Sequence, residues 1–192
     1  WFGQTKMPGN IERGFSSQKL QLVDRSLLNK YFTLDRDAGV QLRHKLNLGE
    51  TFLVRSKLAI SQGEGLNRKA WSSGNSYTGR IELLPFGNFT KKGDYFASDL
   101  KREETPKLML SVTYDYNDNA MRQGGQMGND IAGSTRDLQS IQADAHFKYR
   151  GLSFFGEYAN RVTTDGDPVN DLGEVYHTGS ALNLQGGYLF KN

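Results

Sequence analysis

The feature that most constrains this chain is an alternation of apolar and polar residues with a period of two. Such alternation is typical of β-strands, because successive side chains point to opposite faces of a sheet. Residues 38–48 illustrate it, since Val40 and Leu42 fall on one face and Gln41 and Arg43 on the other. Seven segments follow this pattern after a short strand end over 1–7. They cover 38–48, 51–61, 77–83, 107–117, 138–149, 153–162 and about 176–190.

The connections between these segments differ in length at the two ends of the predicted sheet. Short turns at 47–50 and 149–152 fall at one end, and the longer connection 85–106 falls at that end by parity. Polar loops fall at the other end, over 61–76, 118–136 and 163–175. Short turns on one side and long loops on the other are typical of outer-membrane β-barrels.

Composition fits strands that cross a membrane and does not fit membrane helices. Hydrophobic residues make up 36% of the 192 residues, and no apolar run approaches the roughly 20 that a membrane helix needs. A barrel strand needs an apolar residue only at every second position. Aromatic residues make up 11% of the chain and gather toward the ends of the predicted strands, as in the girdles of membrane barrels.

Alternation by itself also fits a soluble β-sandwich, whose charged face meets bulk water. The girdle placement, the loop asymmetry and strand lengths of roughly 9–12 residues favour a barrel that crosses a membrane. We therefore predict an all-β fold, a transmembrane antiparallel β-barrel. Residues 1–192 are interpreted as a single domain that is a piece of a longer protein.

The segment 9–37 is the longest that does not follow the strand pattern. Its apolar residues recur at helical spacing, at Leu20, Val23, Leu27 and Tyr31. The spacing predicts a helix with Ser16 or Ser17 as its N-cap. One interpretation is a surface helix with a solvated, charged face. The other is a segment whose charges face a confined aqueous space while Leu20, Val23 and Leu27 pack on the wall around it.

Sheet edges decide how wide such a barrel must be. An open edge in lipid leaves backbone groups unpaired, at a cost of several kcal/mol per group. Eight strands that closed on themselves would fill their interior with side chains and leave no room for the 9–37 segment. An inward-folded segment therefore requires a wider barrel, of which this chain would be a part.

Several longer stretches carry a more specific signal. They are GQTKMPGNIERGFSSQKLQLVDRSLLNKYFTLDRDAGVQL, AISQGEGLN, YTGRIELLPFGNFTKKGDYF, LKREETPKL and GSALNLQGGYLFKN. These stretches resemble the phosphate-selective porin O and P family, most strongly over 3–42. The resemblance implies a sixteen-stranded, trimeric outer-membrane channel whose third loop folds into the lumen. It makes 9–37 the constriction loop and this chain a central portion of about half the barrel.

Basic side chains are the candidate lining of the pore. The 9–37 segment supplies Arg13, Lys19 and Arg25, and the polar strand faces supply Arg43, Lys45, Arg55, Lys57 and Arg80. Rings of arginine and lysine suit anion pores, and guanidinium groups match phosphate or carboxylate geometry. Later strands present carboxylates instead, at Glu82, Asp115, Asp144 and Glu157. Two alternatives thus stay open, a weakly selective channel and charge pairs that merely hold the loop.

The predicted function is an outer-membrane porin, located in an outer membrane of the Gram-negative type, for passive diffusion of small anionic or polar solutes. Its expected partners are membrane lipid and two further copies in a homotrimer, and phosphate-like anions are candidate solutes. One alternative is a non-conducting structural barrel or an accessory subunit of an outer-membrane complex. Another is a soluble carbohydrate-binding sandwich.

Enzymatic and nucleic-acid functions find little support in the sequence. His44, His146 and His177 share no metal-ligand spacing, and the absence of cysteine excludes thiolate sites. We therefore predict no catalytic residues, no metal site and no cofactor. The net charge of +3 is weak support for nucleic-acid binding. Aromatic and basic residues over 86–102 are assigned instead to a girdle and a periplasmic connection.

Overall fold

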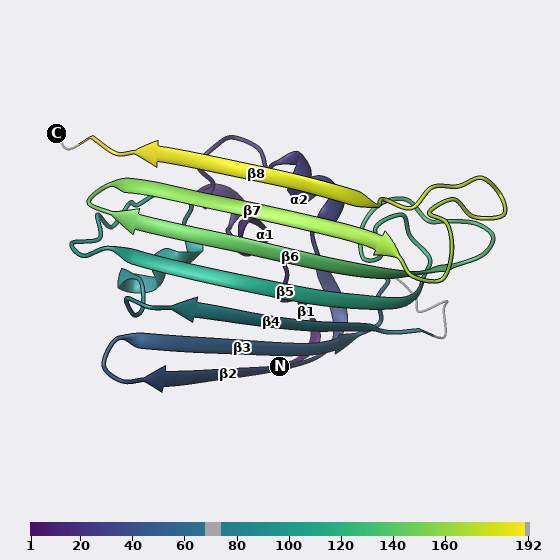
Figure 1. Cartoon of the computed structure of the whole chain (residues 1–192), viewed down its shortest axis with the longest axis horizontal. Coiled ribbons are helices and arrows are strands. Elements are labelled where there is room, and N and C mark those ends of the chain that lie inside the picture. The colour runs from purple at the N-terminus through teal and green to yellow at the C-terminus, as the bar shows by residue number, and fades with distance from the viewer. Residues whose placement is uncertain (68–73, 191–192) are drawn as a thin grey trace.

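The computed structural model describes residues 1–67 and 74–190, and its strands form one eight-stranded antiparallel sheet (Figure 1). The strands follow one another across the sheet in chain order. They are β1 (Phe2–Lys6), β2 (Arg36–Leu48), β3 (Phe52–Ser61), β4 (Ser76–Leu84), β5 (Lys107–Ala120), β6 (Arg136–Tyr149), β7 (Leu152–Thr163) and β8 (Gly179–Tyr188). The all-β class and the predicted strands are confirmed. Within the described residues the sheet is not closed, and β1 and β8 form its two edges.

The connections alternate between the two ends of the sheet, as predicted (Figure 1). The β6–β7 turn is tight, and both Arg150 (φ 48°) and Gly151 (φ 93°) take left-handed conformations. Two central residues with positive φ form a type I′ turn, whose twist matches that of the flanking strands. The predicted loop over 61–76 lies partly outside the described residues, at 68–73.

One face of the sheet is apolar and exposed. Its side chains include Leu42, Leu58, Ile81, Val112, Leu182 and Leu184, which are 55–67% exposed. A soluble protein places such a face against a core. An uncovered apolar surface that runs across most of the strands instead marks contact with a membrane or with another apolar partner.

The opposite face is polar, yet it is buried. Its charged side chains include Arg80, Glu82, Asp144, Lys148, Glu157 and Arg161, which are 1–5% exposed. Charged groups shielded from water are stable only when other charges or hydrogen bonds compensate them. The cover over this face must therefore supply polar partners rather than apolar side chains alone.

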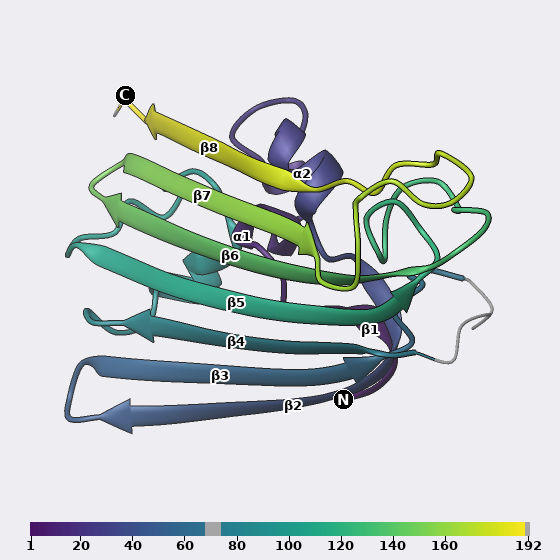
Figure 2. The same cartoon turned by 45° about the vertical axis from the view of Figure 1, so that its right-hand side comes forward.

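Much of that cover is the 7–35 segment, which connects β1 to β2 and lies along the polar face (Figure 2). It carries helix α1 (Ile11–Gly14), the 3-10 turn η1 (Ser17–Lys19) and helix α2 (Leu27–Phe32). None of the helices in the described part of the chain is long and apolar enough to span a membrane. The segment is thus a chain of short helical pieces laid against the sheet.

The single helix predicted over 20–31 is wrong. Residues 20–26 are irregular, and Val23 and Leu27 are 95% and 73% exposed rather than packed on the wall. Ser26 caps α2 in place of Ser16 or Ser17, since its Oγ accepts a hydrogen bond from the backbone N–H of Asn29 at 3.1 Å. Such short helices gain little stability from their own hydrogen bonds, so their ends are fixed by what the sheet offers them.

Two charged side chains of β7 meet the ends of these helices. Glu157 Oε1 accepts a hydrogen bond from the backbone N–H of Glu12, in the first turn of α1, at 2.6 Å. Arg161 donates to the carbonyl oxygens of Tyr31 at 2.8 Å and Phe32 at 3.2 Å, at the end of α2. The first turn of a helix has unpaired N–H groups and the last turn has unpaired carbonyls, so a carboxylate suits one and a guanidinium the other.

An apolar cluster joins the 7–35 segment to the β4–β5 connection on the polar side of the sheet. Ile11 and Phe15 belong to it together with Phe89 of the 85–106 connection. The His146 ring of β6 stacks on Phe89, with 5.4 Å between ring centroids, and lies 5.5 Å from Phe15. The prediction that the aromatic residues over 86–102 belong to a membrane girdle is therefore wrong for Phe89, which is 3% exposed.

Replacement of Arg161 by methionine should loosen α2. The methionine keeps the apolar stem of the side chain but leaves two carbonyl groups at the end of α2 without hydrogen-bond donors. Each buried carbonyl left without a donor costs roughly 1–3 kcal/mol. Amide hydrogen exchange over 27–32 should then accelerate about tenfold or more. The measurement is exchange followed by mass spectrometry in detergent micelles.

Lys101→Met is the matched control, because Lys101 is exposed on the 85–106 connection, away from α2. It removes a cation in the same way and should leave exchange over 27–32 unchanged. Equal exchange rates in Arg161→Met and wild type would show that Arg161 does not hold the helix.

Candidate functional site

A cavity of about 360 Å³ lies between the 7–35 segment and the first strands of the sheet. Seven basic residues line it, namely Lys6, Arg13, Arg36, Arg43, Arg55, Lys57 and Arg80. The carboxylates in its lining belong to Glu82 and Asp94. We call this space the basic cavity. An excess of cations around a confined space produces a positive potential that attracts anions.

A second cavity, of about 580 Å³, adjoins the first toward the end of the sheet that carries the short turns. Lys45 and Lys92 line it, and it shares Arg55, Lys57 and Asp94 with the basic cavity. We refer to the two together as the basic passage. Because the shared residues lie at their junction, that is the place where a solute would meet β3 and the 85–106 connection at once.

Glu82 is the centre of the charge network on the wall of the passage, because it pairs with three cations. Its carboxylate forms ion pairs with Lys57 and, at 2.8 Å, with Arg80 Nε. Arg80 in turn donates both terminal nitrogens to the Asp144 carboxylate, at 2.7 and 2.9 Å. A bidentate arginine–carboxylate pair is among the stronger polar contacts in proteins. Arg80 is therefore committed to the wall and offers little charge to a solute.

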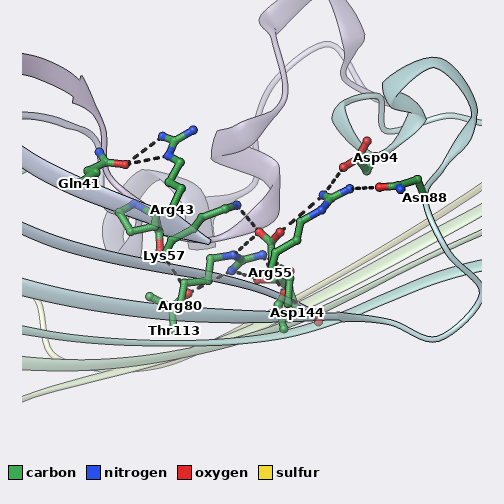
Figure 3. A network of polar contacts seen from close by, with 12 residues as sticks. Gln41, Arg43, Arg55, Lys57, Arg80, Asn88, Asp94, Thr113 and Asp144 are labelled. Carbon is green, nitrogen blue, oxygen red and sulfur yellow. Dashed lines mark hydrogen bonds and ion pairs between the residues drawn. The ribbon is translucent and has the colours of Figure 1, made fainter. Parts of the chain in front are cut away.

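Arg55 and Arg43 differ in how their charges are compensated. Arg55 Nη1 lies 2.6 Å from Asp94, and its Nη2 donates to Asn88 at 2.8 Å, both on the 85–106 connection (Figure 3). Arg43 bonds to the neutral Gln41 side chain at 2.9 Å, and its guanidinium carbon lies 4.1 Å from the Trp1 ring centroid. Arg43 is exposed, and no carboxylate within the described residues pairs with it. Its charge therefore faces the basic passage with no acidic partner among these residues, as does that of the exposed Lys45.

Arg13 reaches the basic cavity from the 7–35 segment and is held by Asp35. Arg13 Nε donates to Asp35 at 2.9 Å, and a second nitrogen pairs with the other carboxylate oxygen. Burial opposes ionisation of Asp35, but the hydrogen bond and charge of Arg13 outweigh it and hold the Asp35 pKa below its ordinary value. The pair fixes the side of the 7–35 segment that faces the passage.

The eight predicted lining residues do not all come together. Five of them line the basic cavity, at Arg13, Arg43, Arg55, Lys57 and Arg80. Lys45 lines the adjoining cavity. Apart from Arg13, which lies in α1, these positions follow directly from the strand alternation, which places every second residue of β2, β3 and β4 on the polar face.

Lys19 and Arg25 lie elsewhere. The Lys19 ammonium sits over the Phe96 ring, 4.0 Å from its centroid. Arg25 donates to the carbonyl oxygen of Phe15 at 2.9 Å and borders a separate depression beside Met127. Both were expected to line the constriction because the segment was treated as one helix with a charged face. Its broken backbone points them in other directions.

Sequence reasoning missed Asp94 and Tyr95 as lining residues. Both belong to the 3-10 turn η2 (Thr90–Tyr95) of the 85–106 connection. No periodic pattern marks that connection, so the sequence carried no signal that it folds over the polar face. An acidic residue beside two lysines and a glycine reads there as a solvated turn.

No grouping of three or more histidine, cysteine, aspartate or glutamate side chains suited to a metal ion occurs within residues 1–67 and 74–190. The chain was also compared with protein-family models, with curated proteins and with solved structures, and none of them matches. The resemblance to the porin O and P family stays a prediction from the sequence motifs.

The Arg13–Asp35 pair should make stability depend on pH in a defined direction. Asp35→Asn should lower the free energy of unfolding at neutral pH by roughly 1–2 kcal/mol, since a charge-assisted hydrogen bond is lost. The Asp35 pKa is lowered by folding, so its contribution is complete above about pH 5 and is lost as pH falls through the lowered value.

The difference between wild type and Asp35→Asn in urea unfolding in micelles should therefore shrink as the pH falls below about 4. Asp167→Asn, in an exposed loop, is the control and should track wild type at every pH. A difference that stays constant down to acidic pH would contradict the role of the Asp35 charge.

Proposed function

We propose that this chain forms part of the wall of a water-filled outer-membrane channel, through which small solutes diffuse passively and anions pass more readily than cations. The observation that carries the proposal is the reversed polarity of the sheet. Its apolar face is exposed, whereas its charged face is covered by the 7–35 segment around a basic passage. Lipid would satisfy the first face, and water with permeating ions would satisfy the second.

The open edges of the sheet support a channel wider than eight strands. β1 pairs with only the first part of β2, and within the described residues β8 has no strand beyond it. Neither edge is stable in lipid unless further strands continue the sheet. The resemblance to the porin O and P family supplies the expected number of sixteen strands and the homotrimeric assembly.

The anion preference rests on charges that face the passage without full compensation. Arg43 has a neutral side-chain partner, and Lys45 adds a second cation on the same strand. Guanidinium groups bind phosphate and carboxylate oxygens in pairs, which makes phosphate-like anions suitable solutes. The preference is expected to be moderate, because Glu82 and Asp94 lie in the same lining.

Two other functions stay as alternatives. A non-conducting barrel is favoured by the apolar cluster, which fills the space over part of β5–β7 where Phe15, Phe89 and Phe155 meet. A soluble sandwich is not favoured, because the described strands form one sheet and leave its apolar face uncovered. A protein that stays soluble and monodisperse without detergent would nevertheless support it.

The channel function is tested by reconstitution of the purified protein in planar bilayers. Stepwise conductance increments are expected, and in a salt gradient the reversal potential should have the sign of an anion-preferring pore. Wild-type protein that inserts into the bilayer and carries no current would overturn the proposal in favour of the non-conducting barrel.

The double variant Arg43→Ala/Arg55→Ala should shift this preference toward cations. It removes two unit charges near the passage and leaves Asp94 without its closest cation. The ratio of anion to cation permeability should fall about fourfold, as expected for two charges that each act across roughly 7–10 Å of water screened by about 0.1 M salt. The reversal potential in the same salt gradient gives this ratio.

Lys101→Ala/Lys107→Ala provides the matched control. It also removes two positive charges, but neither residue lines the basic passage. Its reversal potential should equal that of wild type. If both double variants shift the potential equally, net charge rather than the lining sets the preference.

A further inference from the structure

The 85–106 connection is the second long segment that lies on the polar face, and it enters from the end opposite the 7–35 segment. Lys148 of β6 fixes it to the sheet, because its Nζ donates to the carbonyl oxygens of Gly93, Phe96 and Ser98 at 2.8, 2.7 and 2.8 Å. A lysine with all three of its donors on one segment holds that segment firmly against the strand.

The two segments also hold each other. The backbone N–H of Ala97 donates to the carbonyl oxygen of Lys19 at 2.9 Å, and the Lys19 ammonium covers the Phe96 ring. His146 Nε2 lies 3.3 Å from the Ala97 carbonyl oxygen on the side of the sheet. The 85–106 connection thus packs against both the polar face of the sheet and the 7–35 segment.

A strained turn sets the direction of the connection where it meets the passage. Lys91 (φ 48°) and Lys92 (φ 60°) both take left-handed conformations, and the two residues directly precede Gly93 and Asp94. Left-handed backbone costs about 1–2 kcal/mol for each residue that carries a side chain. Such strain persists where the surrounding structure fixes it, and it gathers at sites that must hold one geometry.

This turn places Asp94 at the junction of the two cavities that make up the basic passage. Asp94 lines both of them and is 6% exposed. Its carboxylate lies 2.6 Å from Arg55, and Asn88 of the same connection binds the other terminal nitrogen of that guanidinium. The connection therefore binds both terminal nitrogens of Arg55 with its own side chains (Figure 3).

The role of Asp94 differs from that of Glu82, the other carboxylate of the basic cavity. Glu82 pairs most closely with Lys57 and Arg80 of the strands, and its second oxygen lies farther, 3.6 Å, from Arg55 Nη1. Asp94 comes from outside the strands and compensates a cation that would otherwise face the solute. It occupies the place on Arg55 that a permeating phosphate or carboxylate would take.

We infer that the 85–106 connection is a second selectivity element of the channel, and that Asp94 is the residue through which it limits the preference for anions. The inference rests on the proposed channel function and adds to it a determinant outside the 7–35 segment. An incoming anion must compete with Asp94 for Arg55, whereas a cation finds one negative charge at the junction of an otherwise basic passage.

Asp94→Asn tests the inference in planar bilayers. The variant removes the carboxylate closest to Arg55 and leaves only Glu82, at 3.6 Å, while it keeps a hydrogen-bond acceptor of similar shape. The ratio of anion to cation permeability should rise about twofold, the effect of one unit charge removed at roughly 7–10 Å in water screened by about 0.1 M salt. The concentration of inorganic phosphate that halves the chloride current should fall as well.

Three companion variants make the result specific. Asp94→Glu keeps the charge and should restore a reversal potential close to that of wild type. Glu104→Gln removes a carboxylate from an exposed position of the same connection, outside the passage, and should change nothing. Asp94→Ser serves as the second neutral variant, with folding of each protein checked by circular dichroism.

The outcomes separate the inference from the function on which it rests. Conducting Asp94→Asn or Asp94→Ser channels with the wild-type reversal potential overturn the inference and leave the channel function intact. A rise in anion preference with Glu104→Gln as large as that with Asp94→Asn also overturns it, because position would then be irrelevant. Wild-type protein without conductance overturns both.

Discussion

The structure depends on a requirement that every charge on the covered face of the sheet finds a polar partner. The cover cannot rest on apolar packing alone, since the side chains beneath it include Glu157 and Arg161 as well as the apolar cluster around Phe15. Those two side chains instead bind the unpaired backbone groups at the ends of α1 and α2. Helix ends are the places where backbone donors and acceptors are free, so short helices with many ends suit a charged wall better than one long helix.

The strands could be predicted from the sequence because the period of two depends on local geometry alone. The 7–35 segment could not, because its conformation depends on distant side chains. The spacing of Leu20, Val23 and Leu27 predicted a helix with an apolar face, yet only Leu20 packs against the apolar cluster, and Ile11, Phe15 and Leu28 are the buried residues. The same reason accounts for the lining, where the predicted residues on strands border the basic passage and, of the three on the segment, only Arg13 does.

The 85–106 connection marks a second limit of prediction from sequence. Its length and parity placed it at the short-turn end, but nothing periodic showed that it turns over the polar face. The contacts that fix the connection there come from Lys148, which lies about 50 residues farther along the chain than Ser98. The alternation of β6 predicts only the face of the sheet on which Lys148 lies. A partner for that lysine could be recognised only once the backbone carbonyls of Gly93 and Phe96 were placed.

The contact between Glu12 and Glu157 joins residues that are 145 positions apart, and Gln185 reaches Glu12 across 173 positions. The 7–35 segment therefore has no complete docking surface until β7 and β8 have joined the sheet. The seven strands that follow the segment can pair one after another before it docks, since each hairpin closes a far shorter loop. The interior of this protein is thus completed late, by a segment that precedes in the chain the strands on which it docks.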